Sequence, residues 1–283
     1  MTTLPTFILG GAQKSGTTTL HHLLSSHPEV FMPRTPQELH FFDFEEDFAK
    51  GLNWYSRFFE DADNAFAVGQ TSPQYLFLPA VPQRIRDCIP GARLIFILRD
   101  PIDRAHSHYW HQVRKGRETL TFEEAIETEE ARTSQSFENL CRFSYTARGF
   151  YARQVSRFRR FFDEDQILLV RTEDLRKDAG AVLDKCYDHI GVSALGSDVA
   201  TRARGIARNQ ARTPRIQCIQ RWASPMRGKA RRMVKLIDRF NLRDVRYPNM
   251  SPETRDRLRE LFEDDVSDLR SRYGVDTGGW LKD

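Results

Sequence analysis

A glycine-containing segment near the N-terminus carries residues suited to binding a phosphate. The stretch FILGGAQKSGTTTLHHLL runs from an apolar strand-like segment through a turn into a helical pattern. A turn of this kind presents backbone N–H groups and the positive end of a helix dipole, which together favour an anion. Lys14 adds a positive charge, and Thr17 and Thr18 add hydroxyl donors at the start of the helix. The segment therefore predicts a P-loop-like strand–loop–helix.

The same loop departs from the nucleoside-triphosphate signature at one position. Gly11 and Gly16 have the required four residues between them, but Thr17 stands where that signature needs lysine. The lysine comes earlier, at Lys14, and cannot occupy the usual place beside the β- and γ-phosphates. An ATP-dependent kinase or NTPase is thus an alternative, with Asp100 as its one candidate magnesium ligand, and a purely structural turn is another.

A second candidate anion site follows the apolar run Arg93–Leu98. Arg99 comes directly after this run, and Ser107 follows eight residues later, beyond Pro101. Ligands of open α/β sheets bind at the carboxyl ends of the strands. A short turn and two helical turns can bring Arg99 and Ser107 to one point. Taken alone, Arg99 and Asp100 are also compatible with an ion pair or a metal ligand.

The two segments together resemble the sulfotransferases that use 3′-phosphoadenosine 5′-phosphosulfate (PAPS). QKSGTTTL is similar to that family's 5′-phosphosulfate loop, and R-D-P-x-x-R-A-x-S-x-Y to its 3′-phosphate site. The resemblance implies that PAPS is the donor, that 3′-phosphoadenosine 5′-phosphate (PAP) is the product, and that no metal is needed. It implies that Lys14 reaches the oxygen bridging phosphate and sulfate. The cofactor contacts implied are Lys14, Ser15, Gly16, Thr17, Thr18, Arg99 and Ser107.

Looser similarity to bacterial and carbohydrate sulfotransferases extends over most of the chain. RGFYARQVSRFRRFF and QILLVRTEDL resemble the helix and strand after the 3′-phosphate site, and residues 274–280 resemble the terminal stretch. ARNQARTPR resembles the late basic loop that closes over the cofactor. This last match implies further cofactor contacts from Arg208, Asn209 and Arg212.

The acceptor of a sulfuryl group must lose a proton as it attacks, so a general base is expected. TPQELHFFDFEED resembles the K-E-x-H-F-F-D motif of heparan-sulfate-type sulfotransferases, which implies that Glu38 is the base and His40 a supporting or alternative one. We expect the neighbouring Leu39, Phe41 and Phe42 to desolvate Glu38 and raise its proton affinity. A turn-capping carboxylate and a core histidine are the structural alternatives.

Two further observations bear on the acceptor. His106, His108 and His111 follow Arg99 on the expected cofactor helix, which makes them poorer candidates for the base than Glu38. In the stretch VGQTSPQYL, Gln70 and Thr71 stand where carbohydrate members often carry Glu-Lys. A charged contact to substrate or leaving group is then missing. The acceptor class stays broad: a carbohydrate, glycolipid or small metabolite, attacked through a hydroxyl or, as second choice, an amine.

The elements that position these residues follow an α/β pattern. Short continuous apolar runs, Thr6–Leu9, Arg93–Leu98 and Gln166–Val170, are typical of strands covered on both faces. Helical periodicity follows the first run and flanks the last. We therefore predict one α/β domain over residues 1–283, with a central parallel sheet flanked by helices. Ser251-Pro252 predicts the start of a C-terminal helix with one apolar stripe: Leu258, Leu261, Phe262 and Leu269.

Composition and charge limit the remaining classes of function and location. The chain has 283 residues and a formal net charge of +4, too small an excess to imply nucleic acid, and no apolar run is long enough to span a membrane. Four separated cysteines and the absence of a secretory signal at the N-terminus indicate free thiols and a cytoplasmic location.

A late segment at about 202–240 differs from the rest of the chain in charge: Arg202–Lys235 holds 11 basic residues and no acidic one. It predicts a solvated helix face, or a flap touching an anionic ligand or a membrane surface. A binding module for nucleic acid or anionic lipid is the alternative that depends on this segment. The oligomeric state is open.

Overall fold

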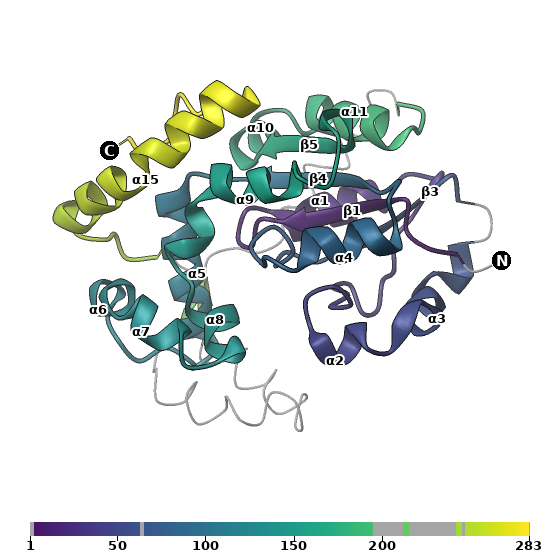
Figure 1. Cartoon of the computed structure of the whole chain (residues 1–283). Coiled ribbons are helices and arrows are strands. Elements are labelled where there is room, and N and C mark those ends of the chain that lie inside the picture. Colours follow the sequence, from purple (N-terminus) through teal and green to yellow (C-terminus); the bar gives the residue numbers. More distant parts are fainter. Residues whose placement is uncertain (1–2, 63–64, 195–211, 215–241, 245–246, 283) are drawn as a thin grey trace. The chain divides into compact units, whose positions relative to one another are not determined.

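The computed structural model describes residues 3–62, 65–194, 212–214, 242–244 and 247–282 (Figure 1). The chain groups into two compact units, each made of discontinuous segments. The first unit contains residues 1–99, 151–208 and 265–277, and the second contains residues 100–150, 209–264 and 278–283. A single domain spanning residues 1–283 stays a prediction.

A five-stranded parallel sheet forms the centre of the first unit (Figure 1). Its strands lie in the order β2-β3-β1-β4-β5, and every neighbouring pair is parallel. Their bounds are β1 Phe7–Gly11, β2 Val30–Phe31, β3 Ala67–Thr71, β4 Arg93–Leu98 and β5 Ile167–Arg171. The predicted α/β class with a central parallel sheet is confirmed.

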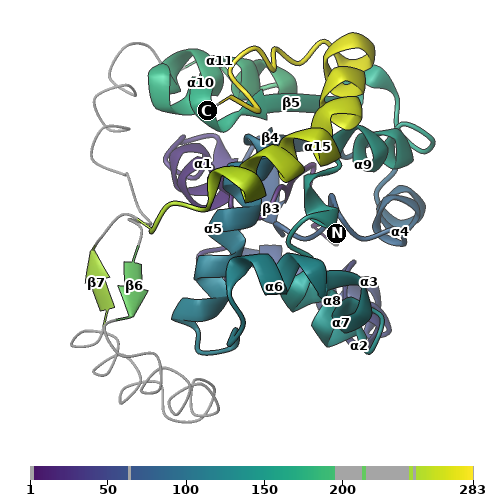
Figure 2. The ribbon, with the colours of Figure 1, turned by 90° about the vertical axis from the view of Figure 1, so that its left-hand side faces the viewer.

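The helices of the first unit cover both faces of this sheet. Their bounds are α1 Thr17–Leu24, α2 Glu45–Phe48, α3 Gly51–Ser56, α4 Val81–Cys88, α9 Tyr151–Phe158, α10 Thr172–Lys177 and α11 Ala179–Ile190, with 3₁₀ turns η1 Arg57–Ala62 and η3 Glu164–Gln166. Figure 2 shows α1 and α11 on one side of the strands and α4 and α9 on the other. Layers of this kind explain why the central strands are apolar throughout, since both of their faces are buried.

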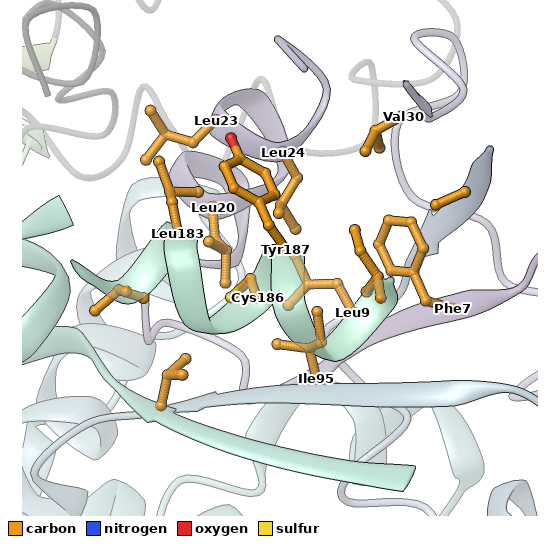
Figure 3. Close-up of a cluster of buried hydrophobic side chains, with 14 of the residues drawn as sticks. Phe7, Leu9, Leu20, Leu23, Leu24, Val30, Ile95, Leu183, Cys186 and Tyr187 are labelled. Atoms are coloured by element: carbon orange, nitrogen blue, oxygen red, sulfur yellow. The ribbon is translucent and has the colours of Figure 1, made fainter. Parts of the chain in front are cut away.

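The core between the sheet and the pair α1 and α11 is apolar and closely packed (Figure 3). Leu20 and Leu24 from α1 and Leu183 from α11 are fully buried against Leu9 and Ile95 of the strands. These are the helical positions that the three- and four-residue apolar spacing predicts. The packing fixes α1, and with it the loop that precedes this helix, relative to the strand ends.

The order of the strands places a crossover at β1. The chain passes from β1 through α1 to β2 and β3 on one side of β1, and then through α4 to β4 on its other side. The carboxyl end of β1 is therefore flanked by the carboxyl ends of β3 and β4. Open α/β sheets bind their ligands in the crevice at such a switch point.

The second unit is mainly helical. Its elements are α5 Pro101–Arg114, α6 Phe122–Glu127, α7 Glu129–Thr133, α8 Phe137–Phe143, η2 Ala147–Gly149 and the antiparallel strands β6 Arg212–Pro214 and β7 Leu242–Asp244. Both views show α6, α7 and α8 gathered at the C-terminal part of α5. Two buried carboxylates connect these elements. Glu118 accepts from Tyr145 Oη at 2.6 Å and pairs with Arg132 at 2.9 Å, and Glu129 accepts from the backbone of Thr146 at 2.6 Å.

The C-terminal helix α15, Pro252–Tyr273, begins as predicted, because Ser251 Oγ accepts from Thr254 N at 3.1 Å. Its predicted apolar stripe is correct at Leu258, Phe262 and Leu269, which are buried, and wrong at Leu261, which is 44% exposed. Val266, one turn beyond Phe262, is buried instead. Cys88 and Cys186 are free thiols. None of the described helices is both long and apolar enough to cross a bilayer.

Candidate active site

The loop between β1 and α1 is a tight turn held against β4. Ala12 N donates to Ile97 O at 2.7 Å and Ser15 N donates to Ala12 O at 3.2 Å, which fixes the turn against β4. Lys14 has φ 71° and Gly16 has φ 102°, both in the left-handed region. Gly16 is the N-cap residue of α1 and tolerates this conformation because it has no Cβ.

The N-terminus of α1 presents a set of backbone hydrogen-bond donors. No side chain caps this helix, and its first turn contains no acidic residue. Two more polar atoms of the loop, Gln13 Oε1 and Ser15 Oγ, are buried and have no hydrogen-bond partner among the described residues. Since buried polar groups are nearly always satisfied, a partner from outside the chain is expected here. Free N–H groups and the helix dipole select an anion, and a hydroxyl can donate to one.

Arg99 reaches this loop from the neighbouring strand. It is the first residue after β4, and its Nη1 donates to Lys14 O at 3.5 Å. Tyr151 Oη donates to Arg99 O at 2.9 Å and fixes the backbone at this position. The structure thus brings two predicted cofactor residues, Lys14 and Arg99, to one edge of the sheet.

Thr172 connects the loop with two strands. It is the first residue after β5, and its Oγ1 lies 2.5 Å from Ser15 O and 2.9 Å from Leu98 O. A hydroxyl has one proton, so Thr172 shares it between the two carbonyls. The side chain is buried. Thr172 therefore ties the loop to the end of β4, and it was not among the residues that the sequence analysis selected.

Asp100 has a structural role that counts against a kinase or NTPase. Its Oδ1 accepts from Ile102 N at 2.9 Å and Asp103 N at 3.1 Å, and its Oδ2 accepts from Leu281 N at 2.7 Å. Burial raises the pKa of Asp100, although these backbone donors oppose that change. Both oxygens are used in capping α5 and holding the C-terminal segment. In the described part of the chain, no three metal-ligating side chains come together.

The other predicted cofactor residues have different outcomes. Ser107 is buried on α5 in the second unit, and its closeness to Arg99 stays a prediction. Arg208 and Asn209 lie outside the described residues, as does most of the basic segment Arg202–Lys235. Arg212 is the first residue of β6. Cofactor contacts from these three residues also stay predictions.

The segment that carries Glu38 lies at the carboxyl end of β3. Glu38 forms a parallel bridge with Thr71, and Leu39 N donates to Thr71 O at 3.0 Å. Leu9 of β1 pairs with the same Thr71 on the other side of β3. Because neighbouring strands are about 4.8 Å apart, the backbone of Glu38 lies roughly 10 Å from β1. The candidate base and the loop between β1 and α1 are therefore held at neighbouring strand ends.

The expected desolvation of Glu38 is wrong. Glu38 is exposed, whereas Leu39, Phe41 and Phe42 are buried. The reason is the extended backbone at the bridge with Thr71, which sends successive side chains to opposite sides. Tyr75 Oη then fixes the turn, since it donates to Leu39 O at 3.0 Å and accepts from Phe42 N at 3.1 Å. The aromatic rings position Glu38 without covering it.

His40 is held by an aspartate three residues later. His40 Nδ1 lies 2.7 Å from Asp43 Oδ2, and the Asp43 side chain is fully buried. Ser72 Oγ donates to the same oxygen at 3.4 Å. Burial lowers the pKa of His40, but the hydrogen bond and charge of Asp43, helped by Glu38 and Asp47, outweigh it, so the pKa lies above the ordinary value. His40 is thus held by Asp43 at the edge of the site and is no core histidine.

His21 completes this edge of the site from α1. Its Nδ1 lies 2.9 Å from Thr71 Oγ1, and the ring is buried. Burial, with a smaller contribution from His22, lowers the pKa of His21 to about 4, so the ring is neutral at neutral pH. Thr71 thereby joins a neutral hydroxyl–imidazole pair at the position where carbohydrate members of the resembled family often have lysine.

Sequence reasoning missed His21, Asp43 and Thr172 for a common reason. Their contacts join residues far apart in the chain, such as Thr172 with Ser15, and depend on which strands are neighbours. Asp43 had a usable signal, since it follows His40 at a spacing of three residues. Thr172 had a weaker one, as the first polar residue after an apolar strand.

Comparison with known proteins agrees with this geometry. The sequence model of the family described as "Sulfotransferase domain" matches residues 4–270. A sulfotransferase from Alicyclobacillus acidocaldarius is 29% identical, with a TM-score of 0.74 over 99% of this chain and 100% of that one. A mouse sulfotransferase complexed with PAP has the same fold, with a TM-score of 0.55 at 16% identity, over 94% of this chain and 84% of that one.

Among curated proteins, the human bifunctional heparan sulfate N-deacetylase/N-sulfotransferase 2 is 28% identical over 295 residues. The match includes 99% of this chain and 31% of that protein. The chain therefore spans about a third of the length of the curated relatives it matches.

Proposed function

The chain belongs to the sulfotransferase family, and from this premise we propose that it transfers the sulfuryl group of PAPS to a saccharide acceptor. The observation that carries the proposal is the open loop between β1 and α1. This loop combines uncapped helix amides, Lys14 and a buried Ser15 hydroxyl that has no partner among the described residues, and Arg99 reaches it from β4. The family supplies the reaction type, and these residues supply the means to bind a donor with two anionic groups.

In this proposal different residues bind the two phosphates of the donor. The free amides at Thr17 and Thr18, with their hydroxyls, hold the 5′-phosphate, as helix N-termini hold phosphates elsewhere. Arg99 holds the 3′-phosphate together with Ser107, since a guanidinium binds phosphate oxygens in a fixed two-pronged geometry. No metal ion is required, because the negative charges are balanced by side chains and amides.

Lys14 has the central role in the transfer step. PAPS supplies an activated sulfuryl group whose departure leaves negative charge on a phosphate oxygen. As the acceptor oxygen or nitrogen bonds to sulfur, the bond from sulfur to the bridging oxygen breaks, and its electron pair stays on PAP. A fixed ammonium from Lys14 at that oxygen stabilises the charge that develops, an effect that is larger in the transition state than in the ground state.

Glu38 takes the proton that the acceptor loses. Its carboxylate is exposed at the end of β3, so a large acceptor can approach it from solvent. His40 with Asp43 is the alternative base. For either group the proton moves from the attacking hydroxyl or amine to the side chain, which keeps the attacking atom nucleophilic.

A saccharide is the acceptor class that the relatives favour. The human relative's name assigns it an N-sulfotransferase activity on heparan sulfate, and it is 28% identical to this chain. A carbohydrate hydroxyl is our first choice of attacking group and an amino-sugar nitrogen the second. The cytoplasmic location, membrane contact through the basic segment and one domain over residues 1–283 stay predictions.

Calorimetric titration tests the donor. PAP should bind in the micromolar range without magnesium, and adenosine 5′-phosphosulfate, which lacks the 3′-phosphate, should bind more weakly. Arg99→Ala should weaken PAP binding at least about tenfold, since a charge-assisted hydrogen bond contributes roughly 1.5–3 kcal/mol. Tight binding of ATP or of an oligonucleotide in place of PAP would favour the kinase or the nucleic-acid module. Radiolabelled PAPS with a panel of saccharides and amino sugars then identifies the acceptor.

A further inference from the structure

The edge strand β5 lies along a groove that is separate from the candidate active site. All five of its residues, Ile167–Arg171, line a groove of about 640 Å³, named here the β5 groove. Its lining contains neither the loop between β1 and α1 nor Arg99 nor Glu38, and it lies within the first unit. Among the described strands of this sheet, only β4 pairs with β5, so the outer edge of β5 has no neighbouring strand there.

The open edge is apolar and incompletely covered. β5 has the sequence ILLVR, and four of its five residues are half-buried, whereas β1 and β3 are buried along their whole length. Exposed edge strands are usually blunted by lysine, proline or a bulge, because their free N–H and C=O groups pair readily with another extended chain. β5 contains neither lysine nor proline, and its one charged residue, Arg171, stands at its end and is held in ion pairs.

The shape of the groove limits what can pair with this edge. One rim comes from α11, at Ala181 and Lys185, and the other from α9, at Val155 and Arg159, with Tyr273–Asp276 beside it. α9 and α11 lie on opposite faces of the sheet (Figure 2), so β5 forms the floor between them. In a second copy of this chain β5 would be equally recessed, and the two edges could not meet. A single extended segment can enter.

The lining of the groove carries four basic and four acidic side chains, but its two lysines lie outside the ion pairs. Arg159 pairs with Glu164 at 2.8 Å, and Arg171 pairs with Asp174 at 2.6 Å and Asp276 at 3.1 Å. Asp178 caps α11 by accepting from Ala181 N at 3.0 Å. The two remaining charged side chains of the lining, Lys177 and Lys185, are exposed and have no hydrogen-bond or ion-pair partner among the described residues.

We propose that the β5 groove is a docking site for an extended acidic segment of a partner protein. The segment adds to the sheet as a strand beside β5, so main-chain hydrogen bonds provide affinity and side-chain pockets provide selectivity. Since side chains alternate along a strand, every second residue of the segment faces the rim with Lys177 and Lys185. Acidic residues are expected at those alternate positions.

The test uses a phage-displayed library of random heptapeptides, selected on the full chain without PAP. Selection should enrich peptides with acidic residues at alternate positions, and a selected peptide should protect the amides of Ile167–Arg171 from hydrogen exchange. Lys177→Glu and Lys185→Glu should each weaken that peptide about two- to fivefold, the range of a single exposed ion pair. The matched control is Arg176→Glu, because Arg176 is exposed beside Lys177 but does not line the groove, and it should leave affinity unchanged.

Several results would overturn the proposal. These are enrichment without alternating acidic residues, no protection of β5 by the selected peptide, or equal loss of affinity in the Arg176→Glu control. A dimer held through β5, detected by sedimentation, would replace the partner segment with a second copy. PAP affinity is measured on the same variants and should not change, so this test and the test of the proposed function succeed or fail separately.

Discussion

Thr172→Val removes the hydroxyl that joins the loop between β1 and α1 to the end of β4. The volume of the side chain hardly changes. In the native chain one buried proton is shared between Ser15 O at 2.5 Å and Leu98 O at 2.9 Å. A net intramolecular hydrogen bond contributes about 0.5–1.5 kcal/mol, and leaving a buried acceptor unsatisfied costs about 1–3 kcal/mol. We therefore expect a total cost of roughly 1–3 kcal/mol.

Whether this cost lowers stability or PAP affinity depends on the conformation that the loop adopts without ligand. If the loop keeps its conformation, Thr172→Val lowers the free energy of unfolding, and the melting temperature falls by about 2–4 °C per kcal/mol for a chain of this size class. If the loop relaxes, the cost is transferred to PAP binding, and each 1.4 kcal/mol raises the dissociation constant about tenfold. We predict that the loss in free energy of unfolding and the loss in free energy of PAP binding together amount to roughly 1–3 kcal/mol.

Thermal unfolding without PAP and calorimetric titration with PAP measure the two effects on the same protein. Thr172→Ser is the matched control, because it keeps the hydroxyl and should retain most of the native stability and affinity. A Thr172→Val protein with native melting temperature and native PAP affinity would refute the positioning role. Equal losses in Thr172→Ser and Thr172→Val would assign the effect to the γ-methyl group instead.

Three further predictions concern side chains of the candidate site. Lys14→Ala should lower turnover far more than it weakens PAP binding, and weak binding with native turnover at saturation would contradict the bridging-oxygen role. Glu38→Gln should lower turnover by ~10²–10⁴-fold at saturating PAPS, the range for a general base. His40→Ala should lower turnover less. If His40→Ala has the larger effect, His40 is the base and Glu38 the supporting residue. Since the pKa of His40 is raised by Asp43, its stabilising contribution should be present in full below about pH 6.5 and lost as the pH rises through the raised folded-state value. Urea unfolding over pH 5–9 should show that Asp43→Asn loses more stability at low pH than at high pH, and a constant difference would show that the pair contributes no charge-dependent stability.

The strands that sequence patterns predicted well are the ones with continuous apolar residues. The predicted run Arg93–Leu98 has the same bounds as β4, and the other two match β1 and β5 with shifts of one or two residues at their ends. β3 was not predicted because its sequence, AVGQT, has two polar residues, although Gln70 and Thr71 are as buried as the rest. β2 has only two residues, too few for a periodic signal. Burial of polar side chains at a strand end reflects the site, which overrides the ordinary preference for apolar strands.

The candidate site was predictable where its chemistry is local in sequence. Lys14 lies in the loop after β1, Thr17 and Thr18 begin α1, and Arg99 directly follows β4, so residue type and spacing were sufficient to place them at one edge of the sheet. Their roles in binding a cofactor stay predictions. The environment of Glu38 was not predictable from the same information. Neighbouring aromatic residues indicated burial, but the bridge to Thr71 turns alternate side chains outward, and that bridge depends on a contact with a distant strand.

The left-handed backbone at Lys14 has a consequence for protein engineering. A side chain with a Cβ in that conformation costs roughly 1–2 kcal/mol, and glycine would remove the cost. A library screened only for resistance to heat would therefore accumulate glycine at this position. The most heat-resistant clones would have lost the Lys14 ammonium group from the loop between β1 and α1. Selection for durability without selection for turnover would then yield a stable protein that binds PAP and transfers almost nothing.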